Sequence, residues 1–226
     1  MPTGQRKFAR EDGKYADFLD TNSGNLKPDG TAFIGSSNLA APSDHIHPLA
    51  SGAQSLVASQ VLAAPAANIT FSGIPQTFSE LRLLAVGASV YSIEGDRWTV
   101  SVNGDTGGHY DLQNIAGANA SASASVKNAQ GLWYIANFSP GDMPGASATA
   151  GVAGILEVII PNYAGTTFQK VGKWYSGYSD AATAGADQIA VSATVAWRST
   201  AAITSLKVAA GDGNLAAGTA AYLYVS

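Results

Sequence analysis

Residues 188–198 read Gln-Ile-Ala-Val-Ser-Ala-Thr-Val-Ala-Trp-Arg, and this stretch decides the fold class. Apolar residues occupy every second position from Ile189 to Trp197, with Ser192 and Thr194 among the positions between them. Successive side chains of a β-strand point to opposite faces, so a period of two predicts a strand with one buried face. No helical period fits these residues.

Other stretches carry the same signal. Residues 97–103 alternate in the same way, whereas residues 80–91 and 150–160 are apolar on both faces. The last two are therefore predicted to be central strands, or strands whose second face meets another subunit. The full set of candidate strands is 69–72, 80–91, 97–103, 109–115, 132–138, 150–160, 168–175, 188–198, 205–209 and 220–225. Together they predict an all-β fold, an antiparallel jelly-roll-like β-sandwich.

Composition divides the chain into three parts. Residues 1–28 form a polar N-terminal arm that cannot bury a core by itself, residues 29–66 a turn-rich linker, and residues 67–226 the sandwich. Within the linker, residues 53–64 fit a short helix or a strand. Gly-, Ala- and Ser-rich stretches at 117–130 and 139–149 are predicted to be long surface loops.

The arm carries a small set of apolar side chains. We expect them to anchor the arm in a groove of another subunit, or alternatively to pack on the chain's own sandwich. These candidate anchors are Phe8, Tyr15, Phe18 and Leu19.

Charge and hydropathy exclude some classes of function. Only 12% of the 226 residues are charged, against roughly a quarter in an average globular protein, and the net charge is −4. Without a basic stripe, nucleic-acid binding is not expected. No apolar run follows Met1 and none approaches ~18 residues, so we expect neither a signal peptide nor membrane insertion.

Two histidines are separated by a single residue in the sequence Asp44-His45-Ile46-His47-Pro48. In an extended segment His45 and His47 project to the same side, and two imidazoles make at most half of a metal site. Three copies around a three-fold axis would supply six nitrogens, suited to a Zn or Fe ion. The alternative is that both histidines only mark the turn before Pro48.

A second candidate site lies in residues 102–110. The Asn-Gly and Gly-Gly pairs predict a structural hairpin turn, while Asn103, Asp105 and His109 offer an alternative as a ligand or cation site. Trp133 and Tyr178 are interpreted either as glycan-stacking aromatics or as core and subunit packing.

Enzyme signatures are missing from the sequence. There is no GxSxG, HExxH, P-loop or dinucleotide motif, and no cysteine nucleophile. The sequence therefore favours a non-enzymatic protein.

Four short segments follow one another in the chain: the linker 29–48, which ends in Asp-His-Ile-His-Pro, and then residues 69–83, 102–110 and 201–206 with 214–219. In this order they resemble segments of virion proteins of tailed bacteriophages. The resemblance covers residues 29–226. It implies a homotrimeric protein of the virion surface, in which a metal ion on the three-fold axis would be held by His45 and His47.

From this resemblance and the predicted loops, our first hypothesis is a fibre or tail-tip attachment protein. It would contact other virion proteins and bind host cell-surface carbohydrate through residues 104–109, 117–130 and 139–149. The alternative is a capsid decoration or head-fibre protein that grips the major capsid shell through its N-terminal arm. A glycan-degrading enzyme is a third, less favoured class.

Overall fold

The chain forms two compact units, residues 1–51 and residues 52–226. A computed structural model describes residues 7–9, 15–17, 54–135, 141–180 and 188–226. In the first unit, β1 (Lys7–Ala9) pairs antiparallel with β2 (Tyr15–Asp17). The described residues contain no helix that is long and apolar enough to cross a membrane.

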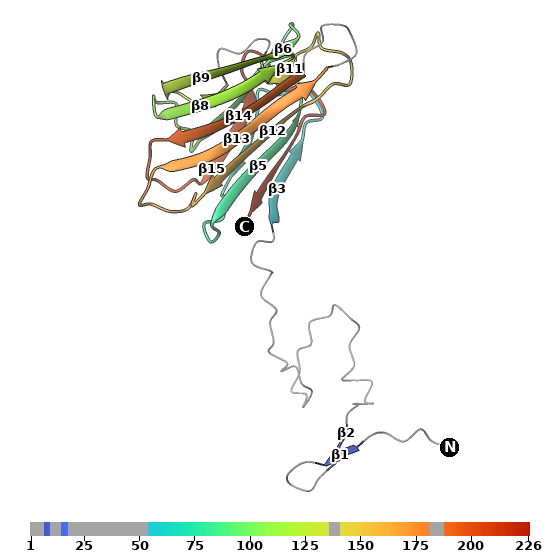
Figure 1. The fold of residues 1–226 in the computed structure, drawn as a ribbon, viewed down its shortest axis with the longest axis vertical. Coiled ribbons are helices and arrows are strands. Elements are labelled where there is room, and N and C mark those ends of the chain that lie inside the picture. The colour runs from blue at the N-terminus through green and yellow to red at the C-terminus, as the bar shows by residue number, and fades with distance from the viewer. Residues whose placement is uncertain (1–6, 10–14, 18–53, 136–140, 181–187) are drawn as a thin grey trace, which may run out of the picture. The chain divides into compact units, whose positions relative to one another are not determined.

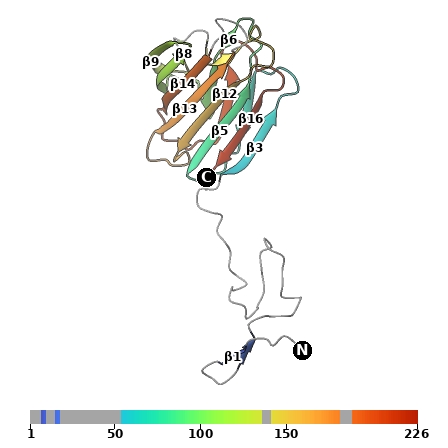
Figure 2. The same cartoon turned by 45° about the vertical axis from the view of Figure 1, so that its right-hand side comes forward.

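The second unit is an antiparallel β-sandwich, as the alternating strands predict. Its large sheet has the strand order β3-β16-β5-β12-β13-β14-β8-β9 (Figure 1). The bounds of these strands are β3 Ser55–Val61, β5 Glu80–Gly87, β8 Tyr110–Ala118, β9 Ser121–Gln130, β12 Gly154–Pro161, β13 Lys170–Ser179, β14 Gln188–Trp197 and β16 Ala220–Val225. Strands β3 and β9 form its opposite edges (Figure 2).

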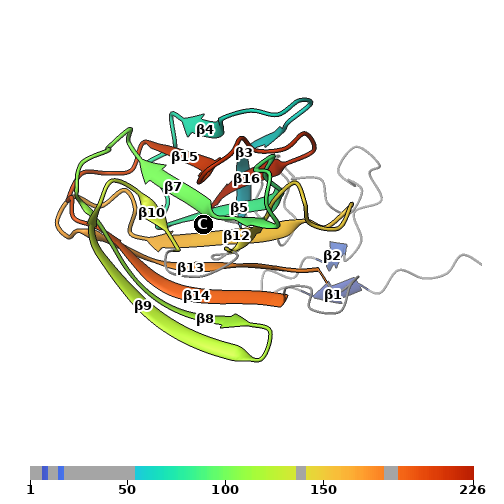
Figure 3. The same ribbon diagram turned by 90° about the horizontal axis from the view of Figure 1, so that it is seen from above.

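A small sheet forms the second layer, with the order β10-β7-β15-β4. Seen from above, it lies in a layer separate from the large sheet, and β9 forms a free edge (Figure 3). Its strands are β4 Asn68–Ser72, β7 Trp98–Val102, β10 Trp133–Tyr134 and β15 Ser205–Ala210. A two-stranded ribbon pairs β6 (Gly95–Asp96) with β11 (Met143–Pro144).

Apolar residues from both layers make one core. In β14 buried residues alternate with exposed or half-buried ones from Gln188 to Trp197, which confirms the period of two. β5 is an inner strand of its sheet, as predicted, with Val86 exposed on its outer face. In β7, by contrast, Thr99 and Ser101 are buried as well as the apolar face, so this strand does not show the predicted alternation of buried and exposed residues.

Three predictions about local structure are decided by the fold. The sequence predicts either a short helix or a strand within residues 53–64, and the structure has a strand there, edge strand β3. The large sheet therefore begins before residue 67, where the sandwich was expected to start. The predicted surface loop 117–130 is wrong, because most of it forms edge strand β9. Within the predicted surface loop 139–149, residues 141–145 are buried instead of exposed. The backbone at Gly141 packs so closely that a Cβ there would lie 1.9 Å from the carbonyl oxygen of Asp96.

A buried carboxylate joins the two sheets. Asp142 accepts hydrogen bonds from the backbone N–H of Trp98 at 3.1 Å and from the Ser176 hydroxyl at 2.5 Å. Ser176 also accepts from Trp174 Nε1 at 2.8 Å. Burial raises the pKa of Asp142 to about 6, because desolvation of the charged form outweighs these hydrogen bonds.

Asp142 should make stability fall as pH rises. Its folded pKa of about 6 exceeds the ordinary value of 3.8, so its contribution is complete below the ordinary value and lost as pH rises through about 6. We expect the free energy of unfolding to decline by on the order of 2–3 kcal/mol across this window. Asp142→Asn should flatten the decline in urea unfolding measured at several pH values.

The matched control for this prediction is Asp212→Asn. Asp212 pairs with Arg97 at the surface, so the decline should persist in this variant. An Asp142→Asn protein with the same pH slope as the parent would contradict the prediction.

Candidate functional site

The predicted metal and anchoring residues lie largely outside the described part of the chain. His45, His47, Phe18 and Leu19 belong to the residues that the structure does not describe. Phe8 and Tyr15 lie in β1 and β2. Across the described ranges, no group of three or more His, Asp or Glu side chains is placed to hold a metal ion.

The predicted turn at Asn103 and Gly104 is present, but it does not close a hairpin. Both residues have positive φ, 53° and 68°, and Asp105 N–H donates to Val102 O at 2.8 Å. These angles are those of a type I′ turn, which suits Asn-Gly. However, β7 and β8 belong to different sheets, so the turn carries the chain from one layer to the other.

The Asn103 side chain ties this turn to the segment before β15. Its Oδ1 accepts from the backbone N–H of Thr204 at 2.8 Å and of Ser205 at 3.0 Å. Its Nδ2 donates to Ala202 O at 2.8 Å. The amide is therefore used within the protein rather than presented to a ligand.

Asp105 is the centre of a second internal cluster. It accepts from Trp197 Nε1 at 2.6 Å, from the Gly107 N–H at 2.8 Å, and lies 2.9 Å from His109 Nδ1. Burial alone would raise the pKa of Asp105, but these hydrogen bonds outweigh it and lower the pKa. The side chain of Asp105 is 19% exposed and that of His109 is 56% exposed. The cluster stabilises the loop, and only the imidazole reaches solvent substantially.

Tyr110 contributes to the same region, although the sequence did not single it out. Its hydroxyl accepts from Val102 N–H at 2.9 Å and lies within hydrogen-bond distance of the carbonyl oxygens of Val102 and Asp105. Burial raises the pKa of Tyr110 to about 12, so the phenol remains a donor. The sequence offers one indication of this role, because Tyr110 is an aromatic residue that directly follows the turn motif.

The glycan-stacking interpretation of Trp133 and Tyr178 is wrong. Trp133 is fully buried, donates from Nε1 to Ala196 O at 2.8 Å, and meets Tyr110 edge-on with ring centroids 5.5 Å apart. Tyr178 is also buried. Both side chains pack in the core, which was the alternative interpretation, because the alternation of side chains along a strand places them on its inner face.

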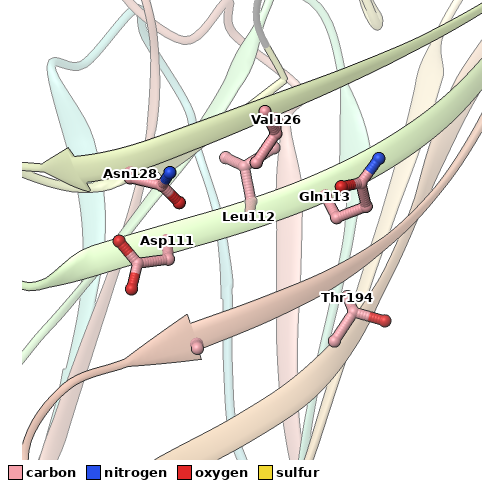
Figure 4. Close-up of a pocket in the computed structure, with 7 residues that line it drawn as sticks. Asp111, Leu112, Gln113, Val126, Asn128 and Thr194 are labelled. Carbon is pink, nitrogen blue, oxygen red and sulfur yellow. The ribbon is translucent and has the colours of Figure 1, made fainter.

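A shallow groove lies between β8, β9 and β14 (Figure 4). It has a volume of about 210 Å³ and arises beside the register shift between Tyr110 and Leu112, where β9 bulges away from β8. The lining residues are Asp111, Leu112, Gln113, Val126, Asn128, Thr194 and Ala196.

The groove combines carbon surface with two unengaged amides. Both oxygens of Asp111 are occupied, one by the Ala129 N–H at 2.8 Å and the other by Arg198 Nε at 3.2 Å. Thr194 Oγ1 accepts from Lys173 Nζ at 3.1 Å. Within the described residues, no hydrogen bond to protein engages the side chains of Gln113 or Asn128.

Sequence reasoning missed this groove. The composition of residues 117–130 predicts a long surface loop there, and neither Gln113 nor Thr194 is among the predicted site residues. The only available signal was the alternation of polar residues in 109–115, which places Asp111 and Gln113 on the outer face. The pairing of β8 with β9 and β14 brings these residues together.

Comparison with models of protein families, with curated proteins and with solved structures finds no match to this chain.

Asp105 should matter far more to stability than His109. Asp105→Ala removes an acceptor from three donors, including the buried Trp197 indole, and should cost about 2–3 kcal/mol at pH 7. His109→Ala removes one exposed partner and should cost below about 1 kcal/mol. Urea unfolding of both variants measures the difference, and similar costs would contradict the structural role of Asp105.

Proposed function

We propose that this chain is a non-enzymatic structural protein of a tailed-phage virion, trimeric and of the fibre or tail-tip attachment type. The sandwich is the displayed part, and the N-terminal arm contacts other virion proteins. Support comes from the resemblance over residues 29–226 and from the division into a short N-terminal unit and a sandwich. The metal ion across His45 and His47 remains a prediction.

The groove between β8, β9 and β14 is the surface that we assign to host glycan. Sugars offer hydroxyl groups that both donate and accept, and the amides of Gln113 and Asn128 match both roles. Val126 and Ala196 provide carbon surface for the apolar face of a sugar ring. This combination of unengaged amides and carbon surface is the observation that carries the glycan assignment.

A neutral glycan fits the groove better than an anionic one. The neighbouring cations Arg198 and Lys173 already interact with Asp111 and Thr194. An anionic sugar would have to compete with the Asp111 carboxylate for Arg198. We therefore expect glycan binding that depends little on salt concentration.

The location of the protein tests the virion assignment. Gold-labelled antibody against the chain should decorate one end of the phage tail in electron micrographs. Labelling spread over the head would instead support the capsid decoration alternative, and unlabelled virions would overturn the assignment altogether. As a control, the protein is added to purified empty capsids and the particle mass is measured. A tail protein should leave this mass unchanged, whereas a capsid decoration protein should increase it.

The groove variants test glycan binding. Gln113→Ala with Asn128→Ala should reduce retention of the protein on host cells at least about tenfold, because two hydrogen bonds to the ligand are lost. Gln60→Ala, an exposed amide on β3 at the opposite edge, is the matched control and should bind like the parent. If the parent, the double variant and Gln60→Ala are retained equally, the groove is not the glycan-binding surface. The virion assignment does not depend on this result, because the labelling experiment tests it.

A further inference from the structure

Strand β9 is a long edge strand with little protection. It runs over ten residues from Ser121 to Gln130, contains no proline, and has Lys127 as its single charged residue. Every residue in it is exposed or half-buried. Because an edge strand directs unpaired N–H and C=O groups away from its sheet, such a strand is a template for pairing with another strand.

The other edges of the two sheets are shorter or interrupted. In the small sheet, β4 has five residues and β10 has two. In the large sheet, β3 has seven residues, and its pairing is broken by a register shift between Leu223 and Tyr224. Short strands and bulges are the usual protection of sheet edges. β9 also contains a bulge near its end, but among the described edge strands it has the longest uninterrupted pairing, from Ser121 to Lys127.

The regular part of β9 lies between Ser121 and Lys127. Over this part it pairs residue by residue with β8, from Ala118 to Leu112, and the bulge comes only beyond it. Ser121, Ser123 and Ser125 lie on the side of the inward-facing Asn114 and Ala116. The opposite side carries Ala122, Ala124 and Val126.

We propose that β9 pairs antiparallel with β9 of a second copy of this chain, around a two-fold axis at Ala124. This register centres on the regular part of the strand. It places Ser123 opposite Ser125, Ala122 opposite Val126, and Ser121 opposite Lys127. Serines then meet serines on one side of the joined sheet, and small apolar residues meet on the other.

Charge and size both favour a second copy as the occupant. The two Lys127 side chains face Ser121 of the other copy rather than each other, so no like charges lie directly opposite. Alanine and serine allow close approach of the two backbones without steric conflict. The strand is therefore complementary to itself, and the unpaired backbone groups of both copies are satisfied together.

This association is separate from the proposed three-fold association and from glycan binding. It joins sandwiches in pairs, so a monomer would become a dimer and a trimer would become a hexamer. Breaking it should therefore halve the mass of the assembly in either case. The glycan proposal is tested on different residues and can fail independently.

Disulfide trapping tests both the pairing and its register. The chain contains no cysteine, so a single introduced cysteine reports only on contacts between copies. In Ala124→Cys the two Cα atoms face each other at about 4.5–5.5 Å, within the range that a disulfide spans. In Ala122→Cys they are about four residues apart along the strands, about 13 Å, and cannot be bridged.

Mild oxidation of the full chain should convert Ala124→Cys to a covalent dimer and leave Ala122→Cys unlinked. Ala190→Cys, an exposed alanine of β14 inside the sheet, is a second control that should remain unlinked. No dimer from Ala124→Cys, or equal yields from the variants, would overturn the proposal.

Charge exchange provides a second test that does not depend on oxidation. Ala124→Lys and Ala124→Asp each place like charges opposite one another and should halve the mass in light scattering, whereas an equimolar mixture should restore it. Ala190→Lys should keep the parent's mass. Far-UV circular dichroism checks that each variant is folded. A parent with the same mass as both charged variants throughout a dilution series would overturn the proposal.

Discussion

The eight-stranded sheet must bury one face, and a sheet of only four strands covers it. The core formed between them contains Trp98, Trp133 and Trp174, which are the largest of its fully buried side chains. The unequal number of strands explains several other features. The edge strand β9 is exposed or half-buried throughout, and its side toward the interior carries serines rather than apolar residues.

Where the chain crosses from one sheet to the other, backbone N–H and C=O groups lose their partners in neighbouring strands. In this protein, polar side chains form hydrogen bonds with several of these groups. Asn103 binds the segment before β15, Tyr110 binds the turn before β8, and Asp142 links β7 with β13. Each of these polar residues costs free energy to bury and is stabilising only when its partners are present. That requirement explains why Asn103 and Asp105, which look like ligand residues in the sequence, serve the fold instead.

The surface chemistry follows from the same arrangement. Where β9 bulges from β8, carbon surface and two amides are left unengaged, which is the basis of the proposed glycan contact. Where β9 runs regularly, its outer edge is left without a partner within the described chain, which is the basis of the proposed pairing. One strand thus carries both surfaces, the first on its outer face and the second along its edge.

The sequence by itself determined the all-β class and the position of most strands, because a period of two in residues such as 188–198 reflects burial on one face. It also determined the Asn103-Gly104 turn, since positive φ at both positions favours these residues. It could not decide which strands pair, because pairing depends on contacts distant in the chain. Only the tertiary structure showed that residues 121–130 form a strand, since their serines and alanines gain a β conformation from β8 rather than from their own preference. For the same reason only the tertiary structure assembled the groove, whose residues come from three strands.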